Sequence, residues 1–415
     1  MSKLVGAAIF GQSGGPTAVI NASAAGVIQE ALKQETITAV YGAAHGIMGI
    51  LKEDFYDMNK EDPYELELLK TTPASSLGSC RYKLKDPNVD DSDYKRIVEV
   101  FKKYNIRYFF YNGGNDSMDT CNKISKYMQK VGYECRVIGV PKTIDNDLYG
   151  TDHCPGYGSA AKYISTSIME VYQDARVYDN HMITVFEIMG RNAGWLTAAS
   201  ALATYKGSGP DLIYLPEVTF DLDKFFEDVK TKFEETHKVF IAVSEGIRDK
   251  NGKYISEYGS DLVKNKDAFG HAQLGGLAAT LAAVLKDKTD AKVRGIEFSL
   301  LQRCAAHVAS QEDVNEAYLA GQIAVQVAVD GTSDKMVAFE RAPGSEYKCN
   351  IKLIDLSVVA NSEKTIPREW INDEGNGLKQ EFIDYALPLI QGESRPVFED
   401  GLPRFTKLKK VLASK

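Results

Sequence analysis

The sequence lacks the features that mark secreted, membrane-spanning and zinc-binding proteins. Its six cysteines are spread over 415 residues, and no two of them form a CxxC pair or a zinc-like spacing. No apolar run approaches the roughly 20 residues that cross a bilayer, and the first residues do not form a signal-peptide pattern. We therefore expect a soluble cytoplasmic protein with mostly buried thiols.

An excess of positive charge is also absent. The chain has 49 lysines and arginines against 57 aspartates and glutamates, a formal net charge of −8. An acidic protein does not attract nucleic acid or an anionic membrane surface, so neither is an expected partner. The 44% hydrophobic and 26% charged residues are an ordinary globular balance, and the length allows two domains. A local basic pocket for a phosphorylated metabolite remains compatible with this composition.

Strand and helix patterns alternate along most of the chain. An apolar strand at residues 4–10 runs into a glycine turn and a helix that ends near residue 33, and residues 107–131 repeat this order. The section from about 148 to 309 has the same organisation, with strands at 182–188, 239–244 and 294–299. Such alternation predicts an α/β protein with mostly parallel sheets that carry helices on both faces.

Two glycine turns between a strand and a helix have the form of anion sites. The first is Gly11-Gln12-Ser13-Gly14-Gly15-Pro16-Thr17 and the second is Gly113-Gly114-Asn115-Asp116-Ser117. Exposed backbone N–H groups and the dipole of the following helix both favour phosphate there, although a simple tight turn is the alternative interpretation. Neither turn has the glycine spacing of a dinucleotide site or of a Walker loop, which argues against a nicotinamide dehydrogenase.

The stretch Pro141–Asp147 concentrates acid–base chemistry behind the apolar strand 135–140. In an extended backbone alternate side chains share a face, which would set Lys142 and Ile144 opposite Thr143, Asp145 and Asp147. A carboxylate at a strand end can take a proton from a substrate hydroxyl, and an ammonium group can neutralise charge that develops on a transferring group. The alternative is that the two aspartates are solvated turn formers.

Further charged residues lie at the ends of other predicted strands or in small-residue loops. Arg81 ends the loop 75–81, and Arg191 closes the turn Met189-Gly190-Arg191. The planar guanidinium fork suits phosphate because it donates hydrogen bonds in pairs. Glu245 at another strand end could accept hydrogen bonds from sugar hydroxyls, or could serve as an ion-pair partner.

The order and types of these residues resemble the phosphofructokinase family over nearly the whole chain up to about residue 331. Thr-Ile-Asp-Asn-Asp at 143–147, with Met-Gly-Arg at 189–191, carries the resemblance. It implies two Rossmann-like doubly wound domains with the active site between them. Residues 1–147 with about 310–415 would form the phosphoryl-donor domain, and residues 148–309 the sugar-phosphate domain.

The resemblance also implies roles for individual residues. Asp145 matches the general base that takes the proton from the C1 hydroxyl of fructose 6-phosphate. The acceptor side would comprise Thr143, Ile144, Asp147, Met189, Gly190, Arg191, Glu245 and Arg303. The donor side would comprise Gly14, Gly15, Arg81, Gly114 and Ser117, with Mg²⁺ as the cofactor.

Two positions indicate which phosphoryl donor is used. Asp116 and Lys142 stand where the ATP-using branch typically carries glycine, and this pair resembles the pyrophosphate-dependent branch. A carboxylate at 116 would repel the α-phosphate of a nucleotide, while a lysine at 142 adds a cation for a small, highly charged donor. The alternatives are an ATP-dependent enzyme of the same fold and a non-catalytic regulatory subunit, although such a subunit would be expected to lose Asp145.

The chain departs from the family pattern at three places. Asn115 replaces a magnesium-linked aspartate, and because an amide oxygen is a weaker ligand than a carboxylate, we expect pyrophosphate and water to hold much of the Mg²⁺. Met182 stands where bacterial ATP enzymes have an arginine that reaches across a subunit interface. Arg303 lacks the glycines that usually follow it. The resemblance implies a homodimer or homotetramer.

Overall fold

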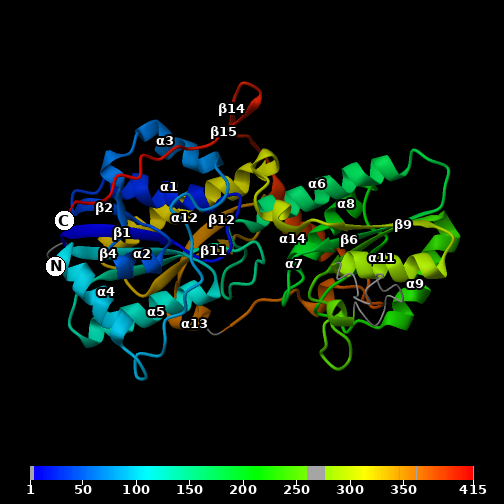
Figure 1. Ribbon diagram of the computed structural model, residues 1–415, viewed down its shortest axis with the longest axis horizontal. Helices are drawn as coiled ribbons and strands as arrows, with labels where there is room; N and C mark the ends of the chain where they lie inside the picture. The colour runs from blue at the N-terminus through cyan, green and yellow to red at the C-terminus, as the bar shows by residue number, and fades with distance from the viewer. Residues whose placement is uncertain (1–3, 259–275, 345, 361, 415) are drawn as a thin grey trace, which may run out of the picture.

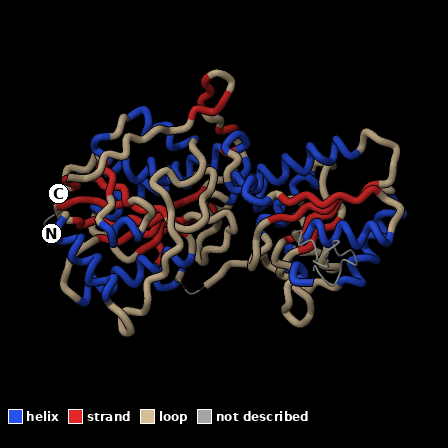
Figure 2. The backbone as a smooth tube through the Cα atoms, viewed as in Figure 1, coloured by secondary structure: helices blue, strands red, loops and turns tan. Residues whose placement is uncertain are grey.

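The computed structural model describes residues 4–414 except 259–275, 345 and 361. It has two lobes that lie side by side along the long axis, each built on its own sheet (Figure 1). In both lobes helices cover the two faces of the strands (Figure 2). The expected α/β fold is therefore confirmed. Among the described residues, no helix combines the length and apolar character that a membrane span requires.

The larger lobe contains a seven-stranded sheet in the order β12-β11-β5-β4-β1-β2-β3. Its parallel centre is made by strands whose apolar runs are almost entirely buried, and β3 and β12 add antiparallel edges. The strands are β1 (Gly6–Gln12), β2 (Ile37–Ala43), β3 (Phe55–Asp57), β4 (Ile106–Gly113), β5 (Arg136–Pro141), β11 (Lys335–Arg341) and β12 (Cys349–Asp355).

Two pairs of long helices sandwich this sheet. On one face lie α1 (Ile20–Ala31) and α12 (Gln311–Val329), and on the other lie α4 (Ser92–Lys103) and α5 (Asn115–Lys130) (Figure 1). Helices α1 and α12 approach closely because glycine faces backbone at their contact. A Cβ atom at Gly26 would lie 2.1 Å from the carbonyl oxygen of Tyr318. Helix α12 is thereby held against the N-terminal half of the chain.

The smaller lobe contains four parallel strands in the order β7-β8-β6-β9. In strand β6 (Met182–Ile188), Phe186 packs into one hydrophobic core and Val185 into the core on the opposite face of the sheet, as the alternation of side chains in a strand requires. The strands are β6 (Met182–Ile188), β7 (Leu212–Tyr214), β8 (Lys238–Ser244) and β9 (Lys292–Glu297); the helices are α6 (Tyr157–Ala175), α7 (Trp195–Ala199), α8 (Ala201–Tyr205), α9 (Leu222–Thr236) and α11 (Leu277–Lys288).

The C-terminal part of the chain connects both lobes. After β12, residues that include Ile366, Phe382 and Leu389 enter the core around α6 and α7 in the smaller lobe. This packing contrasts with the predicted division, which grouped all of 310–415 with the first 147 residues. The remaining elements are α2 (Ile47–Lys52), α3 (Pro63–Leu68), α13 (Leu356–Val359), α14 (Gln380–Ala386), β10 (Ala309–Ser310), β13 (Glu393–Ser394), β14 (Val397–Glu399) and β15 (Leu402–Arg404).

Candidate active site

A cavity of about 560 Å³ lies at the carboxyl ends of β1, β4 and β5. This is the edge at which open α/β sheets bind ligands. Predicted residues of the donor side, the base and part of the acceptor side line it: Gly14, Gly15, Arg81, Gly114, Asn115, Asp116, Ser117, Lys142, Thr143, Asp145 and Asp147. Residues that are far apart in the sequence are therefore brought together at one site.

The first glycine turn and the loop that carries Arg81 form one hydrogen-bonded unit. Gly14 has a φ of 74°, a conformation that glycine adopts without strain. Its N–H donates to the carbonyl oxygen of Cys80 at 3.2 Å, and its carbonyl oxygen accepts from Ser79 Oγ at 2.7 Å. These bonds hold Arg81 over the cavity.

The second glycine turn leads directly into helix α5 at the cavity. Gly114 is the N-cap residue, and no side chain caps this end of the helix, so its positive end can face an anion in the cavity. Asp116 lies in the first turn with its side chain 87% exposed, and its carboxylate is 3.5 Å from Lys83 Nζ. The pair of charges stands at the rim of the cavity.

The stretch after β5 is a turn rather than the extended segment that we predicted. Thr143 Oγ1 accepts a hydrogen bond from the N–H of Asp145 at 3.1 Å, and Asn146 has a φ of 54°. Because the chain turns here, strand alternation does not apply, and the expectation that Lys142 opposes Asp145 is wrong. Lys142 lines the same cavity, with its Nζ donating to the carbonyl oxygen of Gly15 at 2.7 Å.

Asn146 holds this turn from inside the protein. Its Nδ2 donates to the hydroxyl of Tyr385 at 2.8 Å, and its Oδ1 accepts from the N–H of Cys154 at 2.9 Å. The same turn buries Ile144, which is 8% exposed, in the core of the smaller lobe. Ile144 was predicted to bind substrate, but its side chain packs in that core and is not among the residues that line the cavity.

The charged groups of the cavity perturb one another. Burial, together with the negative charges of Asp147 and Glu245, raises the pKa of Asp145 to about 6. Burial also raises the pKa of Asp147. The pKa of Lys142 falls to about 8 because of burial, although Asp145 and Asp147 oppose that change. Such opposed shifts are frequent where a base and a cation are set up for catalysis.

A second cavity, of about 350 Å³, collects predicted acceptor residues of the smaller lobe. Arg191 and Glu245 line it together with Glu187 and Tyr254. Arg191 follows Gly190, which has a φ of 124° and whose carbonyl oxygen accepts from Ser244 Oγ at 2.7 Å. The loop that carries Arg191 is therefore tied to the end of β8.

Two predicted acceptor residues lie elsewhere. The N–H of Met189 donates to Gln302 Oε1 at 3.2 Å, and the Met189 side chain packs against the core of the smaller lobe. Arg303 ends a 3-10 turn, Ser299–Arg303, and lines a side cavity with Gly15 and Arg81. It is therefore grouped with the donor turn and not with Arg191, because the chain after β9 runs back toward the larger lobe.

The cavity also contains groups that fit a divalent cation. Asn115 Oδ1 is buried without a hydrogen-bond partner, while Asn115 Nδ2 donates to Asp147 Oδ2 at 3.4 Å. An unpaired amide oxygen beside a carboxylate is a donor set that hard cations accept. The residues present here are therefore compatible with a bound divalent metal, as the family resemblance implies.

Sequence reasoning missed Glu363, which also lines the main cavity. Its negative charge contributes to the raised pKa of both Asp145 and Asp147. The neighbouring sequence contains no glycine turn or strand end that would have singled it out. Glu363 reaches the site only because the chain after β12 crosses between the lobes, where it forms a β-bridge with Leu148.

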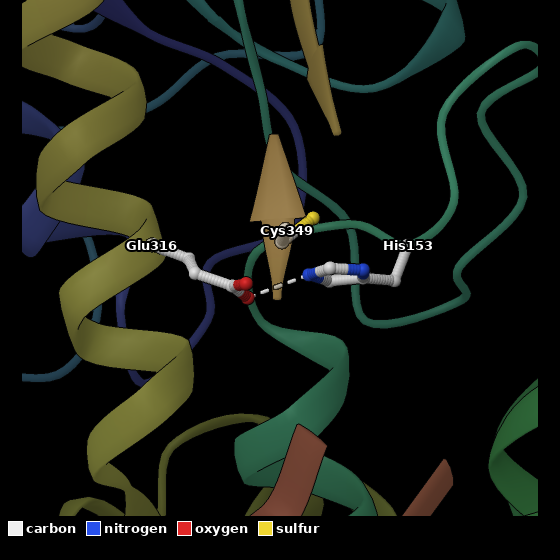
Figure 3. A group of neighbouring side chains, drawn as sticks. All are labelled: His153, Glu316 and Cys349. Carbon is white, nitrogen blue, oxygen red and sulfur yellow. Dashed lines mark hydrogen bonds and ion pairs between the residues drawn. The ribbon is translucent and has the colours of Figure 1, made fainter. Parts of the chain in front are cut away.

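A second group that sequence reasoning missed brings together the loop before α6, helix α12 and strand β12 (Figure 3). His153, Glu316 and Cys349 have potential metal-ligand atoms within 4.8 Å of one another. However, His153 Nδ1 is 2.9 Å from Asp152 Oδ1 and its Nε2 is 2.6 Å from Glu316 Oε2. These carboxylates raise the pKa of His153 to about 9 although burial opposes them. A doubly protonated ring has no lone pair for a metal, so this is a buried ion-pair network.

Comparisons with known proteins agree with the arrangement. The phosphofructokinase family model matches residues 7–297. A protein of Halomonas elongata named pyrophosphate–fructose 6-phosphate 1-phosphotransferase is 44% identical, over 97% of this chain and 96% of its own length. One of the same name from Methylococcus capsulatus is 42% identical, over 98% and 97%.

A solved structure extends the agreement to the fold. The crystal structure of a pyrophosphate-dependent phosphofructokinase from Marinobacter aquaeolei superposes with a TM-score of 0.89 at 40% identity, over 99% of this chain and 98% of that chain. The sequence match, the shared fold and the clustered site residues lead to one conclusion. The chain belongs to the phosphofructokinase family.

Proposed function

We propose that this protein transfers a phosphoryl group from pyrophosphate to the C1 hydroxyl of fructose 6-phosphate, reversibly and with Mg²⁺. The products are fructose 1,6-bisphosphate and phosphate. The observation that carries the proposal is the convergence of Asp145, Lys142 and Arg81 on one cavity beside the turn that connects the two lobes. Relatives more than 40% identical over almost their whole lengths have the name of this reaction.

In this proposal Asp145 is the general base. Its raised pKa, about 6, makes it a better proton acceptor than an ordinary aspartate while it remains mostly ionised at neutral pH. It takes the proton of the C1 hydroxyl as that oxygen attacks the terminal phosphorus of pyrophosphate. The P–O bond to the leaving phosphate breaks, and that phosphate keeps the electron pair.

The cations of the cavity stabilise the transferring group. Lys142 lies at the first glycine turn, and Arg81 and Arg303 lie beside it. Fixed positive charges aimed at a phosphoryl group lower the barrier because they need no rearrangement as charge develops. Bound Mg²⁺, held at Asn115 and Asp147, would supply further neutralisation of the phosphates.

The two lobes then divide the substrates. The larger lobe, with its two glycine turns and the N-terminus of α5, holds pyrophosphate, and the smaller lobe presents Arg191 and Glu245 to the sugar phosphate. Asp116 at the rim disfavours the α-phosphate of a nucleotide by charge repulsion. This location supports pyrophosphate over ATP as the donor.

Steady-state assays with each donor test the proposal. We expect turnover of fructose 6-phosphate with pyrophosphate, turnover in the reverse direction with phosphate, and little or none with ATP. Activity with ATP but not with pyrophosphate would refute pyrophosphate as the donor and favour the ATP-dependent alternative. Absence of turnover with both donors, despite binding of fructose 6-phosphate, would favour the regulatory-subunit alternative.

A further inference from the structure

Residues 363–366 form a strap that contacts both halves of the proposed site. On one side is the turn 142–147 that carries Asp145, here called the catalytic turn. The N–H of Lys364 donates to the carbonyl oxygen of Asp147 at 2.8 Å, and Glu363 forms an antiparallel bridge with Leu148. The Lys364 ammonium group reaches further and donates to the carbonyl oxygen of Asp152 at 2.5 Å. The strap is thus fastened directly to the segment that carries Asp145.

The same four residues are fastened to the loop that follows β6. Asn192 Nδ2 donates to Glu363 Oε1 at 3.1 Å, and Trp195 Nε1 donates to the carbonyl oxygen of Lys364 at 2.9 Å. The N–H of Ile366 donates to Glu217 Oε1, which also accepts from the N–H of Gly194. This loop contains Arg191, the proposed sugar-phosphate contact.

Neighbouring side chains of the strap bond to the two sides. Lys364 Nζ donates to the carbonyl oxygens of Thr151 and Asp152, while Glu363 Oε1 accepts from Asn192 in the loop. Glu363 is the one strap residue among the described residues that both lines the main cavity and bonds to a neighbour of Arg191.

We propose that Glu363 is a positioning residue of the active site, which holds the loop 190–194 against the catalytic turn by accepting a hydrogen bond from Asn192. Its role is to place Arg191 relative to Asp145, so that the sugar phosphate binds with its C1 hydroxyl at the base. The inference rests on the proposed function, since it takes Arg191 as a contact of the sugar phosphate.

A double-mutant cycle tests the bond between the two side chains. We expect Glu363→Ala and Asn192→Ala each to raise the KM and the calorimetric Kd for fructose 6-phosphate about five- to tenfold, with the KM for pyrophosphate within about twofold, as expected for loss of a single hydrogen bond. The double variant should be no worse than either single one. Additive effects, or a wild-type Kd in Glu363→Ala, would overturn the inference.

Further variants separate the hydrogen bond from other roles of Glu363. Glu363→Gln keeps an acceptor oxygen, so it should bind fructose 6-phosphate almost as the wild type does, and a tenfold loss in this variant would contradict a positioning role. Glu369→Ala, which removes an exposed carboxylate from the 3-10 turn Arg368–Trp370 just after the strap, serves as the matched control and should change nothing.

Tryptophan emission checks that the strap stays seated. The chain has only two tryptophans, and Trp195 is bonded to the strap while Trp370 follows it and lies 6.2 Å from Trp195 between ring centroids. If the emission of Glu363→Ala is unchanged, the strap is still in place, and a higher Kd for fructose 6-phosphate is then due to loss of the Glu363 side chain. If the emission changes, Asn192→Ala, which leaves the strap intact, must still show the same increase in the Kd for fructose 6-phosphate. Otherwise the inference is wrong.

The outcome is distinguishable from failure of the proposed function. The calorimetric Kd for fructose 6-phosphate does not require turnover, so the cycle can be completed even with an inactive protein. Absence of pyrophosphate-dependent turnover in the wild type would refute the proposed function. Normal turnover, with no coupling between Asn192 and Glu363 in the Kd for fructose 6-phosphate, would refute only the positioning role.

Discussion

At position 145, burial and the proposed role as a base act against each other. The folded protein raises the pKa of this carboxyl from 3.8 to about 6, so its neutral form is favoured in the folded state. A group with a raised folded pKa contributes stability that is fully present below the unfolded pKa of 3.8 and is lost as the pH rises through about 6. At neutral pH the ionised base therefore destabilises the fold that it serves.

Replacing Asp145 with asparagine should separate these two effects. We expect Asp145→Asn to lose about 10²- to 10⁴-fold in kcat, the usual contribution of a general base. The melting temperature at pH 8 should rise above that of the wild type, with the difference closing below pH 4. Enzyme assays and calorimetry at both pH values check this, and full activity in the variant would exclude Asp145 as the base.

The acid limb of the pH profile follows from the same group. Because the base must be ionised, kcat/KM of the wild type should fall as the pH drops through about 6, and not near the ordinary aspartate value of 3.8. Measuring kcat/KM for fructose 6-phosphate between pH 4.5 and pH 8, as is usual for bell-shaped profiles, tests this. A limb that remains flat down to pH 5 would contradict the raised pKa.

The donor preference is also argued at the scale of two residues. We expect the double variant Asp116→Gly with Lys142→Gly to lower kcat/KM for pyrophosphate by at least about tenfold, because a charged hydrogen-bond donor at the glycine turn is lost. The KM for fructose 6-phosphate should change little. Steady-state kinetics with pyrophosphate and ATP measure both effects.

A matched control for this variant is Lys102→Ala. It removes an exposed lysine of α4 that is not among the residues lining the cavity, and it should leave the pyrophosphate kinetics unchanged. Unchanged pyrophosphate kinetics in the double variant would show that these two positions do not select the donor.

At the scale of elements, the buried network around His153 joins the loop before α6 to helix α12 and, through Tyr347, to the segment before β12. Glu316 from α12 accepts hydrogen bonds from both His153 and Tyr347. The pKa of His153 is raised from 6.5 to about 9, so its stabilising charge is fully present below pH 6.5 and is lost as the pH rises through about 9.

We therefore expect His153→Gln to reduce the free energy of unfolding most at pH 6, with a smaller difference from the wild type above pH 9. Urea denaturation at several pH values measures this. His307→Gln, which makes the same replacement at an exposed histidine, is the matched control. A difference that stays constant from pH 6 to pH 9.5 would contradict the charged-network interpretation.

At the scale of the whole molecule, the expected homodimer or homotetramer remains a prediction. Large apolar side chains are exposed at Leu300 and Leu301, and again on the hairpin β14–β15, which projects from the body of the protein (Figure 1). Exposed apolar groups that gather in this way often mark interfaces between proteins. Sedimentation should therefore give a mass above the 45.8 kDa of one chain, and a monomer at micromolar concentration would contradict the prediction.

The sequence by itself determined the α/β class, the two glycine turns, and the residues Asp145 and Lys142. These features are local: the burial of an apolar run, the turn chemistry of glycine and the charges of a short motif are all set within a few neighbouring residues. Local pattern is less informative at residues 54–70, where the polar sequence shows no strand signal. They form β3, a short 3-10 turn and α3, because Phe55 pairs with β2 across the sheet.

Only the tertiary structure decided which of these groups meet. Lys142 and Asp145 line one cavity because the chain turns after β5, and Asn146 in that turn is anchored to Tyr385, a residue far along the chain. Arg303 joins the donor turn, and Glu363 enters the cavity, through contacts between segments far apart in sequence. The physical reason is that periodicity and motif spacing describe neighbours along the chain. The site, in contrast, is assembled from segments of both lobes and from the C-terminal segment that crosses between them.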